Sequence, residues 1–273
     1  MKKGPESQFE NIWPHMESTM NNRKKHIIVT GASKGFGRDL ALHLAGDGTV
    51  LHLVARSDMS DLVLKLEARG ARVSIWQQDL TNTDKLHDLM TRIAAEIPAD
   101  EAGFIGLVNN AGMLEPVGPA GKYDFETYKK NLEINFVAPL LLTHAFLEFF
   151  QETGIVKRVI MISSGASGKP YHGWSHYCST KAGVDMFVRT VGVEQNQQRN
   201  PVEIMAFNPG RISTDMQESI RSTSEDDFPM VHDFISAWKE GKIGDSAEVA
   251  GRLARVILAE FFPAGEVISH RDI

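Results

Sequence analysis

The sequence predicts a single α/β domain: a doubly wound parallel sheet with helices on both faces. Two observations lead to this fold class. Short runs of branched apolar residues, typical of buried strands, alternate with longer amphipathic segments along most of the chain. No repeat or linker interrupts this alternation, and 273 residues suit one large domain.

Two segments stand outside the regular alternation. Residues 1–22 show no hydrophobic period, so we expect a flexible N-terminal extension ahead of a domain over 23–273. Residues 213–243 are polar, with helical fragments such as 230–239. A segment of this kind over the mouth of a site would be a mobile lid.

The overall composition excludes several classes of function. A net charge of −6 argues against a nucleic-acid partner or an anionic membrane surface. No run of eighteen apolar residues and no apolar leader is visible, and the single cysteine, Cys178, suits a reducing compartment. We therefore expect a cytoplasmic protein. The ten histidines are scattered without ligand spacing, so no metal site is predicted.

The first strand, predicted over 25–30, runs into a glycine-rich turn and then a helix that begins near Leu40. The turn reads Gly31-Ala-Ser-Lys-Gly-Phe-Gly37. Its glycines allow close approach of the backbone, and the helix start presents free N–H groups to an anion. A plain glycine turn is the alternative, but the strand–turn–helix context favours the phosphate cradle of a Rossmann-type dinucleotide-binding domain.

The second strand, 50–55, ends at Arg56 and Ser57. Dinucleotide-binding folds often place an acidic residue here for the ribose hydroxyls, whereas a basic one suits the 2′-phosphate of NADP. Lys34 in the glycine turn adds a second positive charge. The alternative is two solvated surface charges, but their positions favour NADPH.

The middle of the chain continues the alternation, with helices over 58–69 and 84–96 and strands over 72–77 and 104–108. Asp79 either accepts a hydrogen bond from an adenine amino group or caps the helix that follows. Residues 125–150 predict a long apolar helix that carries Asn135 in its interior and Pro139 one turn later. Asn135 is either a satisfied core amide or a water-holding relay at a locally opened turn.

The stretch 163–181 carries the clearest chemistry. Ser164 follows the strand-like run 158–162, so its hydroxyl should lie at the carboxyl end of a strand, where open α/β sheets bind ligands. Tyr177 and Lys181 are one helical turn apart. A neighbouring ammonium lowers the pKa of a phenol, which would fit Tyr177 for general acid–base work. The chain then continues with a helix to 196, a strand over 202–207, a helix over 246–260 and a strand-like tail over 265–269.

Together these motifs resemble the short-chain dehydrogenase/reductase superfamily over about residues 24–273. The matching pieces are the glycine turn, Asn109-Asn-Ala-Gly112, Asn135, Ser164, Tyr177-x-x-x-Lys181 and Asn208-Pro-Gly210. The resemblance implies that Tyr177 is the acid or base on the substrate oxygen, Ser164 orients the carbonyl, Lys181 binds the nicotinamide ribose, and Asn135 holds a water.

The same resemblance implies a set of cofactor contacts, which would hold NADPH. They are Gly31, Ser33, Lys34, Gly35, Phe36, Gly37, Arg56, Ser57, Asp79, Leu80, Asn109, Ala111, Gly112, Tyr177, Lys181, Pro209, Gly210, Ile212 and Thr214.

Within the superfamily the chain resembles the sepiapterin reductases. The segments 170–174, 214–217 and 239–242 carry this likeness, while 268–273 looks more like bacterial reductases of vicinal diketones such as benzil. The implied substrate contacts are Ser164, Tyr171, Trp174, Tyr177, Gly210 and Asp215. Asp215 would anchor a pterin edge, or it is a surface or helix-terminal carboxylate.

The function implied is NADPH-dependent reduction of one carbonyl of a 1,2-dicarbonyl, sepiapterin-reductase-like or, as the alternative, benzil-reductase-like. A non-catalytic NADPH-binding regulator is a third possibility, since fold does not fix function. NAD-dependent alcohol oxidation is disfavoured by Arg56 and Lys34. The apolar helices 125–150 and 175–195 are expected to form a homodimer or tetramer interface.

Overall fold

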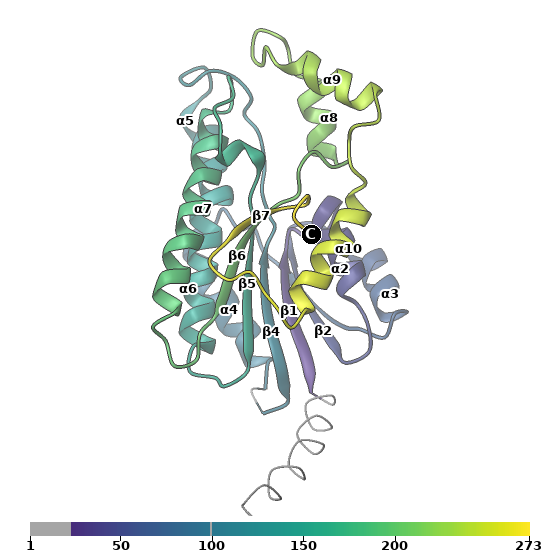
Figure 1. Ribbon diagram of the computed structural model, residues 1–273, viewed down its shortest axis with the longest axis vertical. Helices are drawn as coiled ribbons and strands as arrows, with labels where there is room; N and C mark the ends of the chain where they lie inside the picture. The colour runs from purple at the N-terminus through teal and green to yellow at the C-terminus, as the bar shows by residue number, and fades with distance from the viewer. Residues whose placement is uncertain (1–22, 99) are drawn as a thin grey trace, which may run out of the picture.

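The computed structural model describes residues 23–98 and 100–273, so the predicted extension 1–22 lies outside the described residues. Seven parallel strands form one sheet in the order β3-β2-β1-β4-β5-β6-β7, which confirms the predicted doubly wound α/β fold (Figure 1). The strands are β1 (Lys24–Thr30), β2 (Thr49–Ala55), β3 (Arg72–Gln77), β4 (Ala102–Asn109), β5 (Val156–Ile162), β6 (Glu203–Asn208) and β7 (Val267–Ser269).

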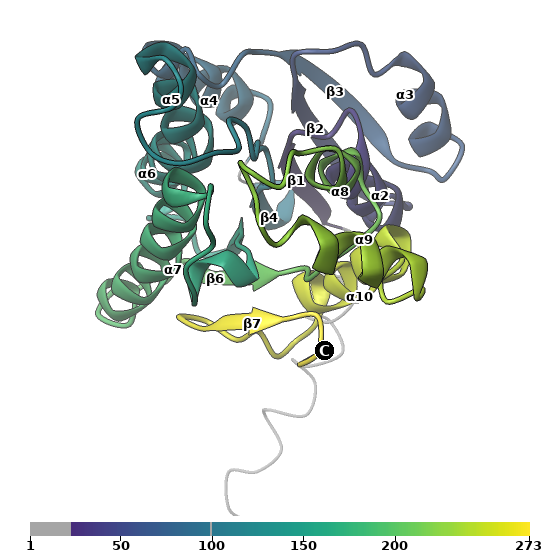
Figure 2. The ribbon, with the colours of Figure 1, turned by 90° about the horizontal axis from the view of Figure 1, so that it is seen from above.

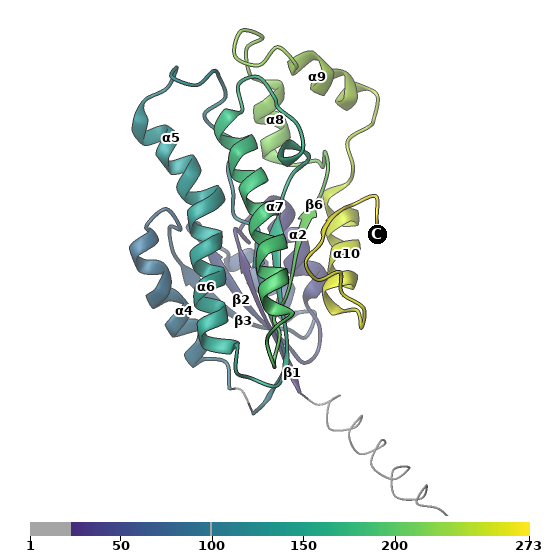
Figure 3. The same ribbon diagram turned by 60° about the vertical axis from the view of Figure 1, so that its left-hand side comes forward.

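Helices cover both faces of the sheet. On one face α2 (Gly35–Leu44), α3 (Ser60–Glu67) and α10 (Ser246–Leu258) share a buried core with the inner strands. On the other lie α4 (Leu86–Ala95), α6 (Ala138–Phe150) and α7 (Ser175–Gln195), as the turned view shows (Figure 3). Because both faces are covered, the strands are almost continuously apolar, as parallel strands usually are.

The strand order reverses between β1 and β4, the strands on which the two halves of the sheet meet. The loops after these strands lead to opposite faces of the sheet, which leaves a crevice at their carboxyl ends. Thr30 closes β1, and its Oγ1 accepts hydrogen bonds from the backbone N–H groups of Asn110 and Ala111, each at 3.0 Å. The glycine turn and the loop after β4 are therefore fixed to each other.

The helix predicted over 125–150 is interrupted. It consists of α5 (Phe125–Leu132), a π-helical turn, η2 (Glu133–Val137), and α6, with Pro139 in the first turn of α6. Proline cannot donate a backbone hydrogen bond, so the ladder is widened there. By length and composition alone this stretch would also suit a membrane span, but α6 packs on α4 and the sheet as a core helix.

The segment predicted as a lid holds two helices, α8 (Asp215–Arg221) and α9 (Val231–Lys239), beyond the carboxyl edge of the sheet (Figures 1 and 2). Its apolar side chains share a third cluster, separate from the two sheet cores, with residues such as Leu114 and Trp174 outside the segment. In this cluster Phe228 and Phe234 pack on Trp174, which precedes α7. Apolar burial therefore holds these helices against the rest of the domain.

A buried histidine pair predicts how stability depends on pH. His26 Nδ1 lies 3.1 Å from His52 Nε2, with Glu96 3.9 Å from His52 and the Trp76 ring beside it. Burial first, then His26, lowers the pKa of His52 to about 4. The imidazole of the unfolded chain titrates near 6.5, so on acidification the unfolded chain takes up the proton before the folded chain does. The free energy of unfolding therefore falls as the pH drops from about 6.5 towards 4.

We expect a loss of about 2 kcal/mol between pH 7 and pH 5 from this group. Urea unfolding at both pH values measures it. His52→Gln should reduce the difference, whereas His144→Gln, at an exposed site, should leave it unchanged. An undiminished difference in His52→Gln would contradict the assignment.

Candidate active site

The four predicted catalytic residues meet at the carboxyl edge of the sheet. Ser164 follows β5, Tyr177 and Lys181 lie on α7, and Asn135 lies in η2. Lys181 Nζ is 5.7 Å from the centroid of the Tyr177 ring, and the Ser164 side chain, whose Oγ accepts from the Ala166 N–H at 3.2 Å, lowers the pKa of the Tyr177 phenol. Asn135 and Lys181 line one small cavity. Three separate segments therefore bring their polar groups to a single place.

Lys181 is buried, and its Nζ donates a hydrogen bond to the Ile162 carbonyl oxygen at 2.7 Å. Burial lowers the pKa of Lys181 to about 8, an effect that the negative charge of Asp185 opposes. The pKa of Lys181 therefore lies close to neutral pH, as expected for a group that exchanges protons.

The expected lowering of the Tyr177 pKa is wrong. Burial raises the pKa of Tyr177 to about 12; the Ser164 side chain lowers it, and Cys178 raises it. Desolvation of the phenolate therefore outweighs any help from Lys181. The half-buried Cys178 packs in the aromatic cluster.

Asn135 is held by two hydrogen bonds to the backbone of Met113. Its Oδ1 accepts from the Met113 N–H at 3.1 Å, and its Nδ2 donates to the Met113 oxygen at 2.7 Å. Nδ2 also donates to Asn131 Oδ1 at 2.8 Å. A Cβ on Gly112 would lie 2.8 Å from Asn135 Oδ1 and 3.9 Å from Lys181 Nζ. Close packing of Asn135 therefore requires glycine at 112.

Asn131 was missed in the sequence. It is fully buried, and its Nδ2 donates to the carbonyl oxygens of Met113, Leu114 and Glu115. The i, i+4 spacing of two asparagines, which places both on one helix face, could have indicated it.

The glycine turn has the form of an anion cradle. Gly31 has φ +65°, and a Cβ there would lie 2.8 Å from Ala111 Cα, so only glycine fits. Asn110 Nδ2 donates to the carbonyl oxygens of Thr30 and Gly31. Helix α2 begins at Gly35, and its N-cap residue, Lys34, makes no side-chain cap. The first N–H groups of α2 thus remain available for a phosphate.

The two predicted cations each have a partner in the free chain. Lys34 Nζ lies 2.7 Å from Asp215 Oδ2, and Arg56 Nη1 lies 3.6 Å from Asp79 Oδ2. All four side chains are at least a third exposed, so these pairs are weak and open to exchange. The alternative that Asp79 caps the next helix is wrong, because its Oδ1 accepts from the N–H and hydroxyl of Thr81 within its own turn.

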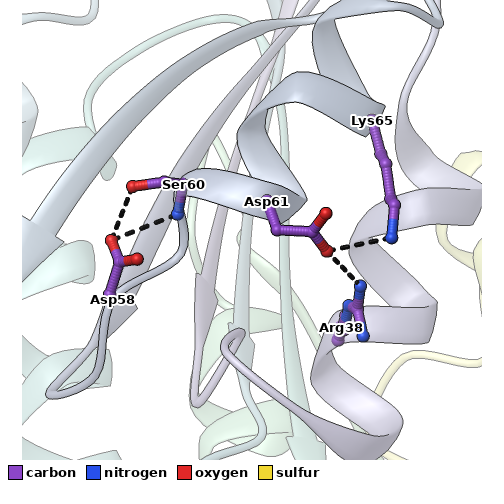
Figure 4. Close-up of polar contacts among 5 residues, drawn as sticks. All are labelled: Arg38, Asp58, Ser60, Asp61 and Lys65. Atoms are coloured by element: carbon purple, nitrogen blue, oxygen red, sulfur yellow. Dashed lines mark hydrogen bonds and ion pairs between the residues drawn. The ribbon is translucent and has the colours of Figure 1, made fainter.

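Arg38, next to the glycine turn, is held elsewhere. Asp61 of α3 accepts hydrogen bonds from both Arg38 and Lys65, each at 2.9 Å, while Asp58 accepts from the Ser60 N–H and hydroxyl (Figure 4). Arg38 therefore joins α2 to α3, and Lys34 and Arg56 are the better candidates for phosphate contacts.

The remaining predicted cofactor residues lie on the loops at this edge, with some side chains turned inward. Phe36, Leu80 and Ile212 are buried, and Asn109 Nδ2 donates to Thr143 Oγ1 at 3.1 Å. Gly210 has φ +74°, and a Cβ there would overlap the His270 ring. Ser33, Ser57, Pro209 and Thr214 lie in the connecting loops; Thr214 is the N-cap of α8.

The predicted substrate residues separate into two groups. Tyr171 and Trp174 pack 4.8 Å apart, and Trp174 meets Tyr177 edge to face at 5.8 Å. Asp215 lies at the first turn of α8 and is paired with Lys34 of the cofactor turn. This position fits the predicted alternative of a surface, helix-terminal carboxylate.

Two residues of the segment predicted as a lid were also missed. The Phe228 ring stacks on Trp174 at 4.7 Å with an interplanar angle of 4°, and Phe234 meets Trp174 edge to face at 5.7 Å. The Arg211 guanidinium lies 4.2 Å from the centroid of the Phe234 ring. The helical spacing of Phe228, Val231 and Phe234 within a polar segment could have indicated a buried face.

A family model of the short-chain dehydrogenases matches residues 25–225. The chain belongs to this family, whose members use NAD(P)(H). It is a carbonyl reductase of the oxidoreductase class.

Among similar proteins, benzil reductase ((S)-benzoin forming) of Bacillus cereus is 37% identical over 244 residues, 89% of this chain and 98% of that protein. Sepiapterin reductase of Rattus norvegicus is 33% identical over 258 residues, 90% of this chain and 96% of that protein. The crystal structure of a Saccharomyces cerevisiae short chain dehydrogenase/reductase gives a TM-score of 0.76 at 28% identity, covering 91% of this chain and 96% of that one.

Tyr177→Phe removes the one phenolic proton at the meeting point of the four residues. We expect turnover to fall by about 10²–10⁴-fold, because general acid catalysis contributes that much. Cofactor affinity, measured by calorimetric titration, should change little. Tyr123→Phe, on the loop before α5, serves as a matched control that keeps activity. Full activity in Tyr177→Phe would contradict the assigned role.

Proposed function

We propose that this protein is an NADPH-dependent reductase of one carbonyl of an aromatic 1,2-dicarbonyl. The observation that carries the proposal is the juxtaposition of Tyr177 with an aromatic wall. Trp174 lies beside the phenol, with Phe228 stacked behind it and both rings buried, and the partly exposed Tyr171 packs on Trp174 as the ring that can meet a substrate.

Tyr177 is the acid in the proposed mechanism. Its high pKa keeps the phenol protonated at neutral pH and ready to donate to the substrate oxygen. Ser164 hydrogen-bonds at the same place and orients that oxygen. When bound, the nicotinamide cofactor supplies the hydride. The Lys181 ammonium stabilises the phenolate left after proton donation, and Asn135 in the adjoining cavity supports resupply of the proton.

The preference for NADPH rests on Lys34 and Arg56. They lie on the two loops that follow β1 and β2, at the carboxyl edge of the sheet. Each is mostly exposed, and each is held by a single carboxylate. A dianionic 2′-phosphate competes well for such cations, because charge-assisted hydrogen bonds to phosphate are strong.

Between the two substrate types, the structure favours a diaryl diketone such as benzil. Asp215, the candidate pterin anchor, is engaged by Lys34, which holds the pKa of its carboxyl below the usual range. The aromatic wall needs no such anchor. The identity to benzil reductase of Bacillus cereus, 37%, also exceeds that to the rat sepiapterin reductase, 33%. Sepiapterin remains the second candidate, since the Asp215 pair is exposed and can exchange.

We also propose a cytoplasmic homodimer formed through α6 and α7. Exposed apolar side chains lie along these helices: Leu141, Met186 and Val193. Met186→Glu combined with Val193→Glu should give monomers in sedimentation velocity, and Leu64→Glu on α3 should not. An unchanged association state in the double variant would refute this interface.

Arg56→Asp should reverse the cofactor preference. A carboxylate repels the 2′-phosphate and accepts hydrogen bonds from ribose hydroxyls, so the NADPH/NADH ratio of kcat/KM should fall by at least about tenfold. Arg38→Ala, whose guanidinium is held by Asp61, is the matched control and should keep the ratio. A ratio unaffected by Arg56→Asp would refute the role of Arg56.

Parallel NADPH-oxidation assays with benzil and sepiapterin test the substrate assignment. We expect the higher kcat/KM with benzil, and we expect Asp215→Asn to leave benzil reduction within about twofold. A higher kcat/KM with sepiapterin, lost in Asp215→Asn, would instead make Asp215 a pterin anchor. Failure to reduce either compound would refute the proposed substrate class.

A further inference from the structure

Asp185 is a buried carboxylate that the mechanism above does not use directly. It lies on α7 one turn beyond Lys181, only 6% exposed. Its Oδ1 accepts a hydrogen bond from the Ser163 hydroxyl at the end of β5. The Ser163 N–H in turn donates to the Phe207 oxygen of β6, so the carboxylate is anchored to the sheet. Burial of a carboxylate is costly, so this position calls for a compensating charge.

Lys181 supplies that charge. Lys181 and Asp185 are four residues apart on one helix, and both side chains are buried on its inner face. The ammonium donates its hydrogen bond to the Ile162 oxygen rather than to the carboxylate. The two charges therefore act on each other without a direct hydrogen bond, and the Asp185 charge raises the pKa of Lys181 against the effect of burial.

The other groups around Lys181 are neutral side chains. Tyr177 and Cys178 come from α7, Ser164 from the end of β5, Asn135 from η2 and Asn109 from the end of β4. Among the described residues, burial and Asp185 are the two influences that shift the pKa of Lys181, in opposite directions.

We propose that Asp185, anchored by Ser163, is a positioning residue that keeps the buried Lys181 ammonium charged under Tyr177. The inference rests on the proposed reductase function. Its chemistry is simple: a neutral lysine amine cannot stabilise the phenolate that Tyr177 becomes after proton donation. Without Asp185, burial would lower the pKa of Lys181 further, so as the pH rises the ammonium would lose its proton, and the reduction would fail, earlier than in the unchanged protein.

The test is the pH profile of kcat for dicarbonyl reduction by Asp185→Asn. We expect its alkaline limb to move on the order of one pH unit lower, so that activity falls nearly tenfold near pH 8.5 but stays within about twofold at pH 6. Asp185→Glu keeps the charge and should restore the limb. Ser163→Ala keeps the carboxylate and should largely retain the limb.

An equal loss at all pH values, or an unmoved limb in folded Asp185→Asn, would overturn the proposal. If that variant does not fold, the double change Ser163→Ala with Asp185→Leu removes both polar partners together and should show the same shift. NMR titration of ¹³C-methylated lysines needs no substrate, and Lys181 should titrate at lower pH in Asp185→Asn. This readout decides the role of Asp185 even if neither dicarbonyl is reduced, which would refute only the proposed function.

Discussion

The buried ammonium of Lys181 is the constraint on which the site depends. It lies under a tyrosine that itself resists ionisation, and its hydrogen bond goes to a strand-end carbonyl, that of Ile162. A charge in this position is stable only where the chain supplies compensating dipoles and charge. The Ile162 carbonyl at the carboxyl end of β5 and the Asp185 carboxylate on α7 supply them, so the charge of Lys181 depends on both the sheet and α7.

The order of the strands brings the parts of this site together. Because the chain reverses between β1 and β4, the glycine turn, the loop after β4 and the loop after β5 all reach the same edge. Thr30 fixes the first two loops to each other, and Lys181 ties α7 to the third. The aromatic cluster then places the lid helices beside Tyr177. Loops far apart in sequence thus build the cofactor cradle and the substrate wall on a rigid base.

Much of this could be predicted from the sequence, for physical reasons that individual residues show. The strand pattern predicted the fold because parallel strands buried on both faces are almost wholly apolar. Tyr177, Lys181 and Ser164 were found because helical spacing and a strand end place them together. Pro139 correctly indicated the break in the long helix, seen as the π-helical turn η2.

The remainder depended on tertiary packing. The Tyr177 pKa could not be predicted, because its direction is set by burial, which local spacing does not report. The pairing of Lys34 with Asp215 joins residues 181 positions apart, and each had been assigned a separate ligand. Asn131 and Phe228 take part through contacts with the loop after β4 and with Trp174. Pairings across the fold, rather than motifs along the chain, determine these details.

Chemical rescue of Lys181→Ala tests the central claim most directly. The variant should lose reductase activity, and added propylammonium should restore part of it, because this cation matches the atoms that the substitution removes and supplies the charge. Propanol, similar in size but neutral, should restore nothing. Equal rescue by both compounds, or full activity of the variant alone, would show that the buried charge does not drive the chemistry.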